Sequence, residues 1–186
     1  MAYPSKIAFM VLAVSGLASL CAGFWIPAKA VLAQYLLHRA WQHSLTGGHI
    51  VKPWPWADTW PVGRLQNDRL GIDLIILEGD SGEVLAFGPG HLSRSSAPGE
   101  DGHCILAGHR DTSFTFLKDL RVGDRLSLEG PAGKEVFVVE NTGAVRAEEL
   151  YLDNERIGAL TLITCFPFNA VTPHTPVRYV VTAHKG

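Results

Sequence analysis

An uncharged apolar segment near the N-terminus constrains this chain more than any other feature. Residues Ile7 to Ile26 carry no charged side chain. A transmembrane helix needs about 20 apolar residues to cross the roughly 30 Å hydrocarbon core of a bilayer, and this segment supplies them. Trp25 lies at its end, where an indole suits the membrane interface. We therefore predict that residues 1–27 form a transmembrane anchor.

A cleaved signal peptide is the alternative for this segment. Lys6 resembles a basic n-region, and Ala28-Lys29-Ala30 resembles a small-x-small cleavage site. The apolar run is longer than the usual signal-peptide core of about 7 to 15 residues, which favours an anchor. Lys6 on one side and Lys29 and Arg39 on the other hardly determine orientation. Because the whole domain follows a first apolar segment, we expect a single-pass protein whose domain is exported.

Residues 28–62 are expected to connect the anchor to the domain. Residues 28–43 are rich in alanine and leucine at helical spacing, which predicts a helix that ends at Gly47-Gly48. This helix either extends the anchor or lies on the bilayer or the domain. Prolines and tryptophans alternate from Lys52 to Pro61 and predict an extended segment whose tryptophans pack on the domain.

The remaining residues, 63–186, have the pattern of short strands separated by turns. The chain contains 19 glycines and 11 prolines, which favours a mostly β domain over a helical bundle. A net charge of −2 and the lack of a basic stripe exclude nucleic acid as an expected partner. We predict an antiparallel or mixed barrel with little helix. The predicted strands are 71–78, 103–107, 124–128, 135–141, 160–164 and 177–183, and the predicted helical turns are 81–86, 115–120 and 147–150.

The three cysteines occur in different settings. Their odd number argues against a disulfide framework, and no Cys-x-x-Cys pair indicates a zinc site. Cys21 lies in the apolar segment, and Cys104 lies inside a short apolar strand, where a cysteine usually packs in the core. Cys165 closes a strand just before Phe166-Pro167, so its side chain is expected to be accessible. Position alone leaves a nucleophile and a core residue equally open for Cys165.

Two further residues have the chemistry that a cysteine nucleophile needs. His109 follows the apolar run that ends at Gly108, and Arg178 lies at the start of the last predicted strand. A histidine can carry a proton to a departing amine, and an arginine can donate hydrogen bonds to an oxyanion. An arginine on a strand is, however, more often a solvated edge residue. The histidines show no metal-ligand spacing, so we expect no metal site.

The stretch Thr161-Leu162-Ile163-Thr164-Cys165 resembles the Thr-Leu-x-Thr-Cys signature of the sortases. Gly108-His109 upstream and Arg178 downstream match the order of that family's His, Cys and Arg. The resemblance covers residues 63–183. The Pro/Trp-rich connector and the Phe-Gly-Pro-Gly-His stretch at 87–91 are similar to the sortases of Gram-negative proteobacteria.

This resemblance implies a mostly β fold, an eight-stranded sortase-like β-barrel with short helices that follows the N-terminal transmembrane helix. His109 would follow the fourth strand, Cys165 would end the seventh, and Arg178 would lie in the eighth. Cys165 would attack a peptide carbonyl, Arg178 would stabilise the oxyanion, and His109 would protonate the leaving amine. The segments 166–177 and 147–157 would wall the groove.

The resemblance also implies the partners and the location. The substrate would be an exported protein with a C-terminal sorting motif like Leu-Pro-x-Thr-Gly, and the domain would face the periplasm. Thr164, Asp111 and Phe166 are the predicted substrate-binding residues. Asp111 orients a neighbouring side chain or caps the turn at Thr112-Ser113. The resemblance implies that no metal or organic cofactor is needed. Some relatives bind calcium, but Glu148-Glu149 is an isolated pair and not a carboxylate cluster.

Two alternatives to a transpeptidase stay open at this point. A hydrolase would use the same three residues, with water in place of the acceptor amine, and the acceptor has no recognisable motif. A non-enzymatic, membrane-anchored β-barrel that binds a partner would not need Cys165 to be reactive.

Overall fold

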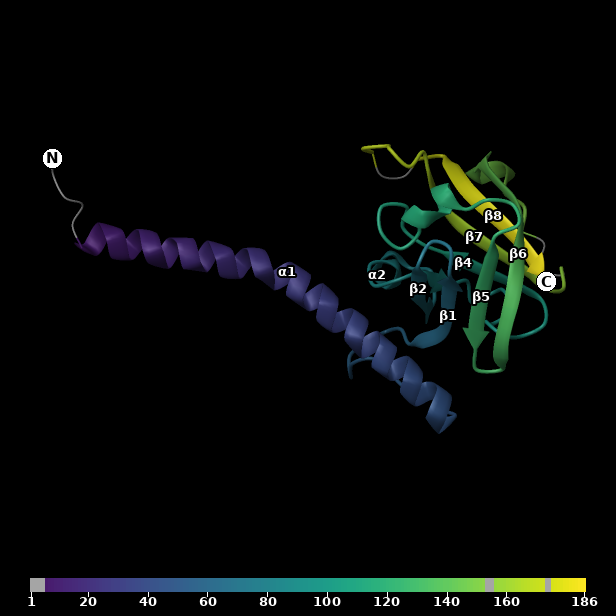
Figure 1. Ribbon diagram of the computed structural model, residues 1–186, viewed down its shortest axis with the longest axis horizontal. Helices are drawn as coiled ribbons and strands as arrows, with labels where there is room; N and C mark the ends of the chain where they lie inside the picture. Colours follow the sequence, from purple (N-terminus) through teal and green to yellow (C-terminus); the bar gives the residue numbers. More distant parts are fainter. Residues whose placement is uncertain (1–5, 153–155, 173–174) are drawn as a thin grey trace.

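A computed structural model describes residues 6–152, 156–172 and 175–186 (Figure 1). A long helix leads into a closed barrel of eight strands, and one short α-helix and two 3-10 turns lie between the strands. The elements are α1 (Lys6–Gly47), β1 (Pro61–Asn67), β2 (Ile72–Glu78), α2 (Gly82–Leu85), β3 (Gly90–His91), β4 (His103–Ala107), η1 (Thr115–Asp119), β5 (Arg125–Gly130), β6 (Gly133–Arg146), η2 (Ala147–Glu149), β7 (Ala159–Phe166) and β8 (Val177–Lys185).

The barrel is mixed, with strand order β1-β2-β3-β4-β7-β8-β6-β5 and closure between β5 and β1. The pairs β2–β3 and β4–β7 are parallel, and the other pairs are antiparallel. The fold prediction of an eight-stranded barrel with few short helices after an apolar helix is therefore confirmed. His109 follows β4, Cys165 lies near the end of β7, and Arg178 lies near the start of β8.

The strand predictions differ from the structure at three places. β3 has two residues, too short for an alternating pattern, and it was not predicted. β1 was not predicted as a strand either, and it begins at Pro61, two residues before the predicted domain boundary at residue 63. The predicted strand 135–141 is part of a longer β6 that extends to Arg146, because the more polar second half of β6 pairs along its length with β8.

The main core fills the barrel. Side chains that alternate along each strand point inward, as Cys104 and Leu106 do on β4 and Leu160 and Leu162 do on β7. Phe114 closes the interior from the segment that follows β4. Because of this alternation, the side chains between the inward ones belong to the outer face of the same strands.

Helix α1 is continuous through Pro27. It ends at Gly47, which agrees with the helix end predicted at Gly47-Gly48. No break separates the predicted anchor, residues 1–27, from the predicted connector. Figure 1 shows that α1 bends along its length, which fits the hydrogen bond that a proline removes inside a helix.

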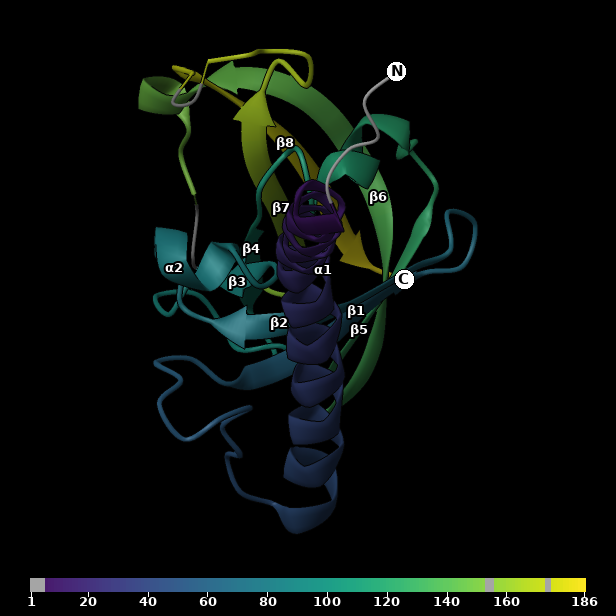
Figure 2. The ribbon, with the colours of Figure 1, turned by 90° about the vertical axis from the view of Figure 1, so that its left-hand side faces the viewer.

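The C-terminal part of α1 packs on the barrel, in front of β1 and β2 in the view of Figure 2. Leu37 and Trp41 form a second core with Ile75, Leu77 and Val84. In the connector that follows α1, Trp54 contacts Phe87 edge-on with ring centroids 5.1 Å apart. Packing of the connector's tryptophans is thus partial, because Trp56 is 79% exposed.

Candidate active site

The predicted nucleophile and the predicted oxyanion donor face each other across two paired strands. β7 and β8 are antiparallel, and Cys165 is the register partner of Arg178. Residues directly opposite in such a ladder have Cβ atoms about 4.5 to 5.5 Å apart and project to the same face. The thirteen-residue separation in sequence is therefore closed by the β7–β8 turn, and the two side chains are neighbours.

The predicted histidine comes to the same level from the other side of β7. β4 and β7 run parallel, with Ala107 opposite Ile163. The ladder continues past β4, because the amide of Gly108 donates to the carbonyl of Ile163 at 3.1 Å. His109 follows Ala107 by two residues, as Cys165 follows Ile163, so an extension of this register beyond the end of β4 puts His109 level with Cys165. We call His109, Cys165 and Arg178 the row.

This row lies on the outer face of the barrel wall. On β7, Leu160 and Leu162 point into the core, so Thr161, Ile163 and Cys165 belong to the outer face. Cys165 is half-buried, whereas His109 is exposed. A reagent or a peptide can therefore approach the row from outside the barrel.

Arg178 is half-buried, and its side chain bonds to the backbone at the start of its own strand, β8. Its Nη1 donates to the carbonyls of Thr175 at 2.5 Å and of Val177 at 3.1 Å. A guanidinium has five donors in a planar fork, and both of these bonds start at one nitrogen. Arg178 can therefore be anchored by Nη1 while it donates to an oxyanion from another nitrogen.

Cys104 contrasts with Cys165 in its electrostatic setting. It is 3% exposed and lies in the core. Burial raises the pKa of the Cys104 thiol well above its usual range, and the Glu135 carboxylate adds to the effect. A thiol in this state is a poor nucleophile, because the thiolate is the reactive form.

The three predicted substrate-binding residues have different surroundings. Thr164 is 2% exposed and its hydroxyl donates to the carbonyl of Gly108 at 2.7 Å. The Asp111 carboxylate accepts from Nε of Arg110 at 3.1 Å, and its side chain is 66% exposed. The Phe166 ring stacks on Tyr179 with centroids 5.9 Å apart. Contact of these residues with substrate stays a prediction.

Arg110 is a residue at this site that sequence reasoning missed. It follows His109 directly and is 7% exposed. Its guanidinium donates to three carbonyls of the loop after β7, those of Pro167 at 2.9 Å, Ala170 at 2.5 Å and Thr172 at 3.4 Å. The available sequence signal was an arginine next to the candidate histidine, but its partners are backbone atoms, which have no sequence signature.

A small cavity lies beside the outer face of β4. Its volume is about 230 Å³, and it extends between the β3–β4 loop and the segment before β7. The segment 147–157, predicted to wall the groove, contributes Leu152, while residues 153–155 lie outside the described part of the chain. Its lining residues are Leu92, Arg94, Ser95, Ile105 and Leu152.

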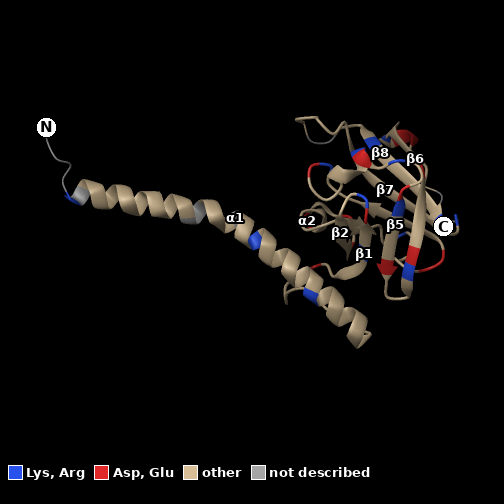
Figure 3. Ribbon diagram, viewed as in Figure 1, with Lys and Arg blue, Asp and Glu red and all other residues tan. Residues whose placement is uncertain are grey.

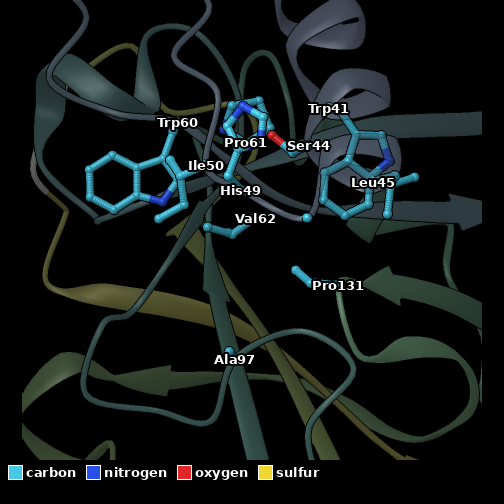
Figure 4. Close-up of a pocket in the computed structure, with 11 residues that line it drawn as sticks. Trp41, Ser44, Leu45, His49, Ile50, Trp60, Pro61, Val62, Ala97 and Pro131 are labelled. Carbon is cyan, nitrogen blue, oxygen red and sulfur yellow. The ribbon is translucent and has the colours of Figure 1, made fainter.

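A larger cavity of about 470 Å³ lies at the opposite end of the barrel (Figure 4). It is bounded by the end of α1, the start of β1 and the β5–β6 turn, whereas Cys165 lies where β7 ends and β8 begins. Trp41, Trp60, Val62 and Pro131 give it mainly apolar walls. It is therefore separate from the row of His109, Cys165 and Arg178.

The described residues contain no group of three or more His, Cys, Asp or Glu that would hold a metal ion. Glu148, one of the two carboxylates considered at the sequence level, pairs with Arg146 at 2.6 Å.

Comparisons with known proteins identify relatives over this same region. A family model described as Sortase domain matches residues 65–186. Over 122 residues the chain is 34% identical to Sortase D of Bacillus subtilis (strain 168), which covers 64% of this chain and 61% of the relative. The match thus spans about three fifths of that relative's length.

Solved structures agree with this match. A Sortase D5 transpeptidase of Clostridium perfringens has a TM-score of 0.65 at 20% identity, covering 83% of this chain and 98% of that chain, and shows the fold. Sortase C-1 of Actinomyces oris has a TM-score of 0.57 at 28% identity, covering 68% of this chain and 72% of that chain. None of these relatives bears on the predicted similarity to the sortases of Gram-negative proteobacteria, which stays a prediction.

Proposed function

The chain belongs to the sortase family, and from this premise we propose that it is a membrane-anchored cysteine transpeptidase. Its substrate is an exported protein with a C-terminal sorting motif like Leu-Pro-x-Thr-Gly. The observation that carries the proposal is the row of His109, Cys165 and Arg178 at the ends of three adjacent strands. A nucleophile, a proton carrier and an oxyanion donor on one accessible face are the parts that acyl transfer needs.

The first half of the reaction forms an acyl-enzyme. The Cys165 thiolate attacks the carbonyl carbon before the scissile bond, and the carbonyl oxygen becomes an oxyanion. Arg178 donates hydrogen bonds to this oxyanion, a role that its position opposite Cys165 in the β7–β8 register supports. When the tetrahedral intermediate collapses, the C–N bond breaks, His109 protonates the leaving amine, and a thioester to Cys165 remains.

The second half transfers the acyl group to an acceptor amine. The amine attacks the thioester carbonyl, His109 accepts its proton, and the Cys165 thiolate leaves. The exposed position of His109 supports this step, because an incoming amine can reach it from solvent. Water as the acceptor would turn the same cycle into hydrolysis.

The cavity beside β4 supports a peptide as the substrate. Its walls combine the apolar side chains of Leu92, Ile105 and Leu152 with the polar side chains of Arg94 and Ser95. An apolar side chain of a sorting motif can be buried there while the scissile bond lies farther along the outer face, toward Cys165. Extended peptides fit a shallow groove on a strand face well, because alternate side chains point to it.

The long helix supports a membrane anchor. One helix near the N-terminus is long and apolar enough to cross a bilayer. Its first half is fully exposed where described, with side chains such as Phe9, Leu17 and Phe24, and Figure 3 shows few charges along α1. We propose that this part spans the cytoplasmic membrane once and that the barrel lies on the extracytoplasmic side, the periplasm in a Gram-negative host.

Peptide cleavage with and without an amine tests the function. The full chain in detergent is incubated with a peptide that contains Leu-Pro-x-Thr-Gly, with triglycine or with buffer alone, and the products are identified by mass spectrometry. We expect a new amide to triglycine that requires Cys165. If both reactions give the same hydrolysed product, the chain is a peptidase and not a transpeptidase. If the peptide is not cleaved and Cys165 is alkylated slowly, the chain is a binding module.

Two further measurements test the membrane arrangement. Carbonate extraction should leave the chain with the membrane fraction, whereas release into the soluble fraction would contradict an anchor. An impermeant maleimide should label Cys165 from outside in spheroplasts. Labelling that requires membrane disruption would instead place the barrel in the cytoplasm.

A further inference from the structure

Arg110 joins the segment of His109 to the loop after Cys165. The guanidinium is buried and bonds to the carbonyls of Pro167, Ala170 and Thr172, so it holds most of the described part of the β7–β8 loop. The carbonyl of Arg110 in turn accepts from Oγ1 of Thr115 at 2.7 Å. Arg110 is thus fixed at its backbone and extends its side chain across the site.

Two hydrogen bonds connect the segment around His109 with the segment around Cys165, and Arg110 makes one of them. On one side, the Thr164 hydroxyl donates to the carbonyl of Gly108 at 2.7 Å. On the other side, Nη1 of Arg110 donates to the carbonyl of Pro167 at 2.9 Å. Both chain neighbours of His109 are therefore bonded to residues within two positions of Cys165.

We propose that Arg110 is a positioning residue that sets the distance between His109 and Cys165 and holds residues 166–172 of the β7–β8 loop as a wall of the site. The catalytic consequence rests on the proposed transpeptidase function, whereas the structural consequence does not. Arg110 acts through its neighbours and touches neither the substrate nor the reacting atoms.

The geometry requires the fork of an arginine and not merely a positive charge. The bonds to the three loop carbonyls leave from Nη1 and Nη2, and Nε bonds to Asp111. A lysine has one nitrogen at the end of a flexible stem and cannot cover carbonyls spread over this stretch. The one carboxylate partner, Asp111, is largely exposed, so a surface ion pair contributes little to the hold on Arg110.

Two substitutions and a matched control separate positioning from general stability. Arg110→Lys keeps the charge, and Arg110→Met keeps an apolar stem. The control is Arg69→Met, because Arg69 likewise bonds a backbone carbonyl, that of Asp119 at 2.7 Å, and a carboxylate, that of Asp124. Arg69 connects the β1–β2 turn to the start of β5 and is not part of the row.

Two readouts are measured on the full chain in detergent. The first is deuterium uptake of peptides that cover residues 166–172. The second is kcat and KM for the sorting peptide, with kcat expressed per folded chain, the fraction folded being measured by circular dichroism. A residue that only supports folding lowers the fraction of folded chains, but it does not lower kcat per folded chain.

We expect faster deuterium uptake in the loop for both Arg110 variants and not for Arg69→Met. We also expect kcat per folded chain to fall about 10- to 100-fold, the loss that a small misplacement of reacting groups produces. Wild-type uptake and kcat in Arg110→Lys would overturn the proposal, as would equal losses in Arg69→Met. If wild-type protein cleaves no peptide, the proposed function fails, and the uptake measurement alone decides whether Arg110 holds the loop.

Discussion

Cys104 and Cys165 lie on two paired strands of one barrel, on opposite sides of its wall. Cys104 points into the core beside Leu106, and burial raises the pKa of its thiol. Cys165 lies on the outer face near the end of its strand, opposite Arg178. Strand alternation and strand ends, more than residue type, therefore determine which of the two thiols can act as a nucleophile.

Replacing Cys165 with alanine has the largest expected effect, and the same replacement of Cys104 is the comparison. Cys165→Ala should lower kcat for the sorting peptide by about a thousandfold or more, because no other group can form the thioester. Cys104→Ala should retain a kcat close to that of the wild type, because that thiol lies inside the barrel. Product formation followed by mass spectrometry measures both. Comparable activity losses in the two variants, with both folded by circular dichroism, would contradict the contrast.

Removal of the cation opposite Cys165 should have the next largest effect. Arg178→Ala should lower kcat about 10² to 10³-fold, the usual loss when an oxyanion donor is removed. Arg178→Lys should recover part of this loss, because it keeps the charge but not the fork. Arg69→Ala, which removes a surface arginine, controls for the change in net charge. Full activity in Arg178→Ala would show that Arg178 is a solvated strand residue and not the oxyanion donor.

Chemical labelling should separate the two cysteines without any substrate. Iodoacetamide should modify Cys165 at least about a hundredfold faster than Cys104, because a core thiol reacts only when the fold opens locally, at a cost of several kcal/mol. Peptide mapping assigns the modification to each cysteine, and urea should abolish the difference. Equal rates in the native chain would show that the position of Cys165 confers no advantage.

The local features of this molecule were predictable because they depend on neighbours in sequence. β4 has the predicted bounds, His103 to Ala107, since a turn residue or glycine marks each end. The helical turns near 82–85, 115–119 and 147–149 lie within the predicted ranges. Cys104 was predicted to pack in the core, and it does.

The remaining features depend on contacts between distant residues. The parallel pairing of β4 with β7 brings His103 opposite Ala159. The sequence of neither strand indicates which strand it pairs with. The two-residue β3 exists because its flanking segments place it between β2 and β4. Arg110 bonds to carbonyl oxygens, which every residue carries. The family resemblance supplied the order of His109, Cys165 and Arg178, but not the residues that hold them in place.

The pH dependence of stability gives the smallest effect and the finest test of the contrast. Burial raises the pKa of the Cys104 thiol, so the folded chain keeps that proton where the unfolded chain releases it. Above the ordinary thiol pKa of about 8.5, the free energy of unfolding should therefore fall by up to about 1.4 kcal/mol per pH unit from this group. Below that pH both states hold the proton and the contribution vanishes.

Cys104→Ala should remove this part of the slope. Urea unfolding in detergent at pH 7.5 and pH 9.5, followed by tryptophan fluorescence, gives the loss of stability for wild type and variant. We expect the wild type to lose up to about 1.4 kcal/mol more than Cys104→Ala over this interval, because only about one of its two pH units lies above the ordinary thiol pKa. Parallel losses would mean that the Cys104 thiol ionises in the fold. The core position would then no longer explain why Cys165 reacts and Cys104 does not.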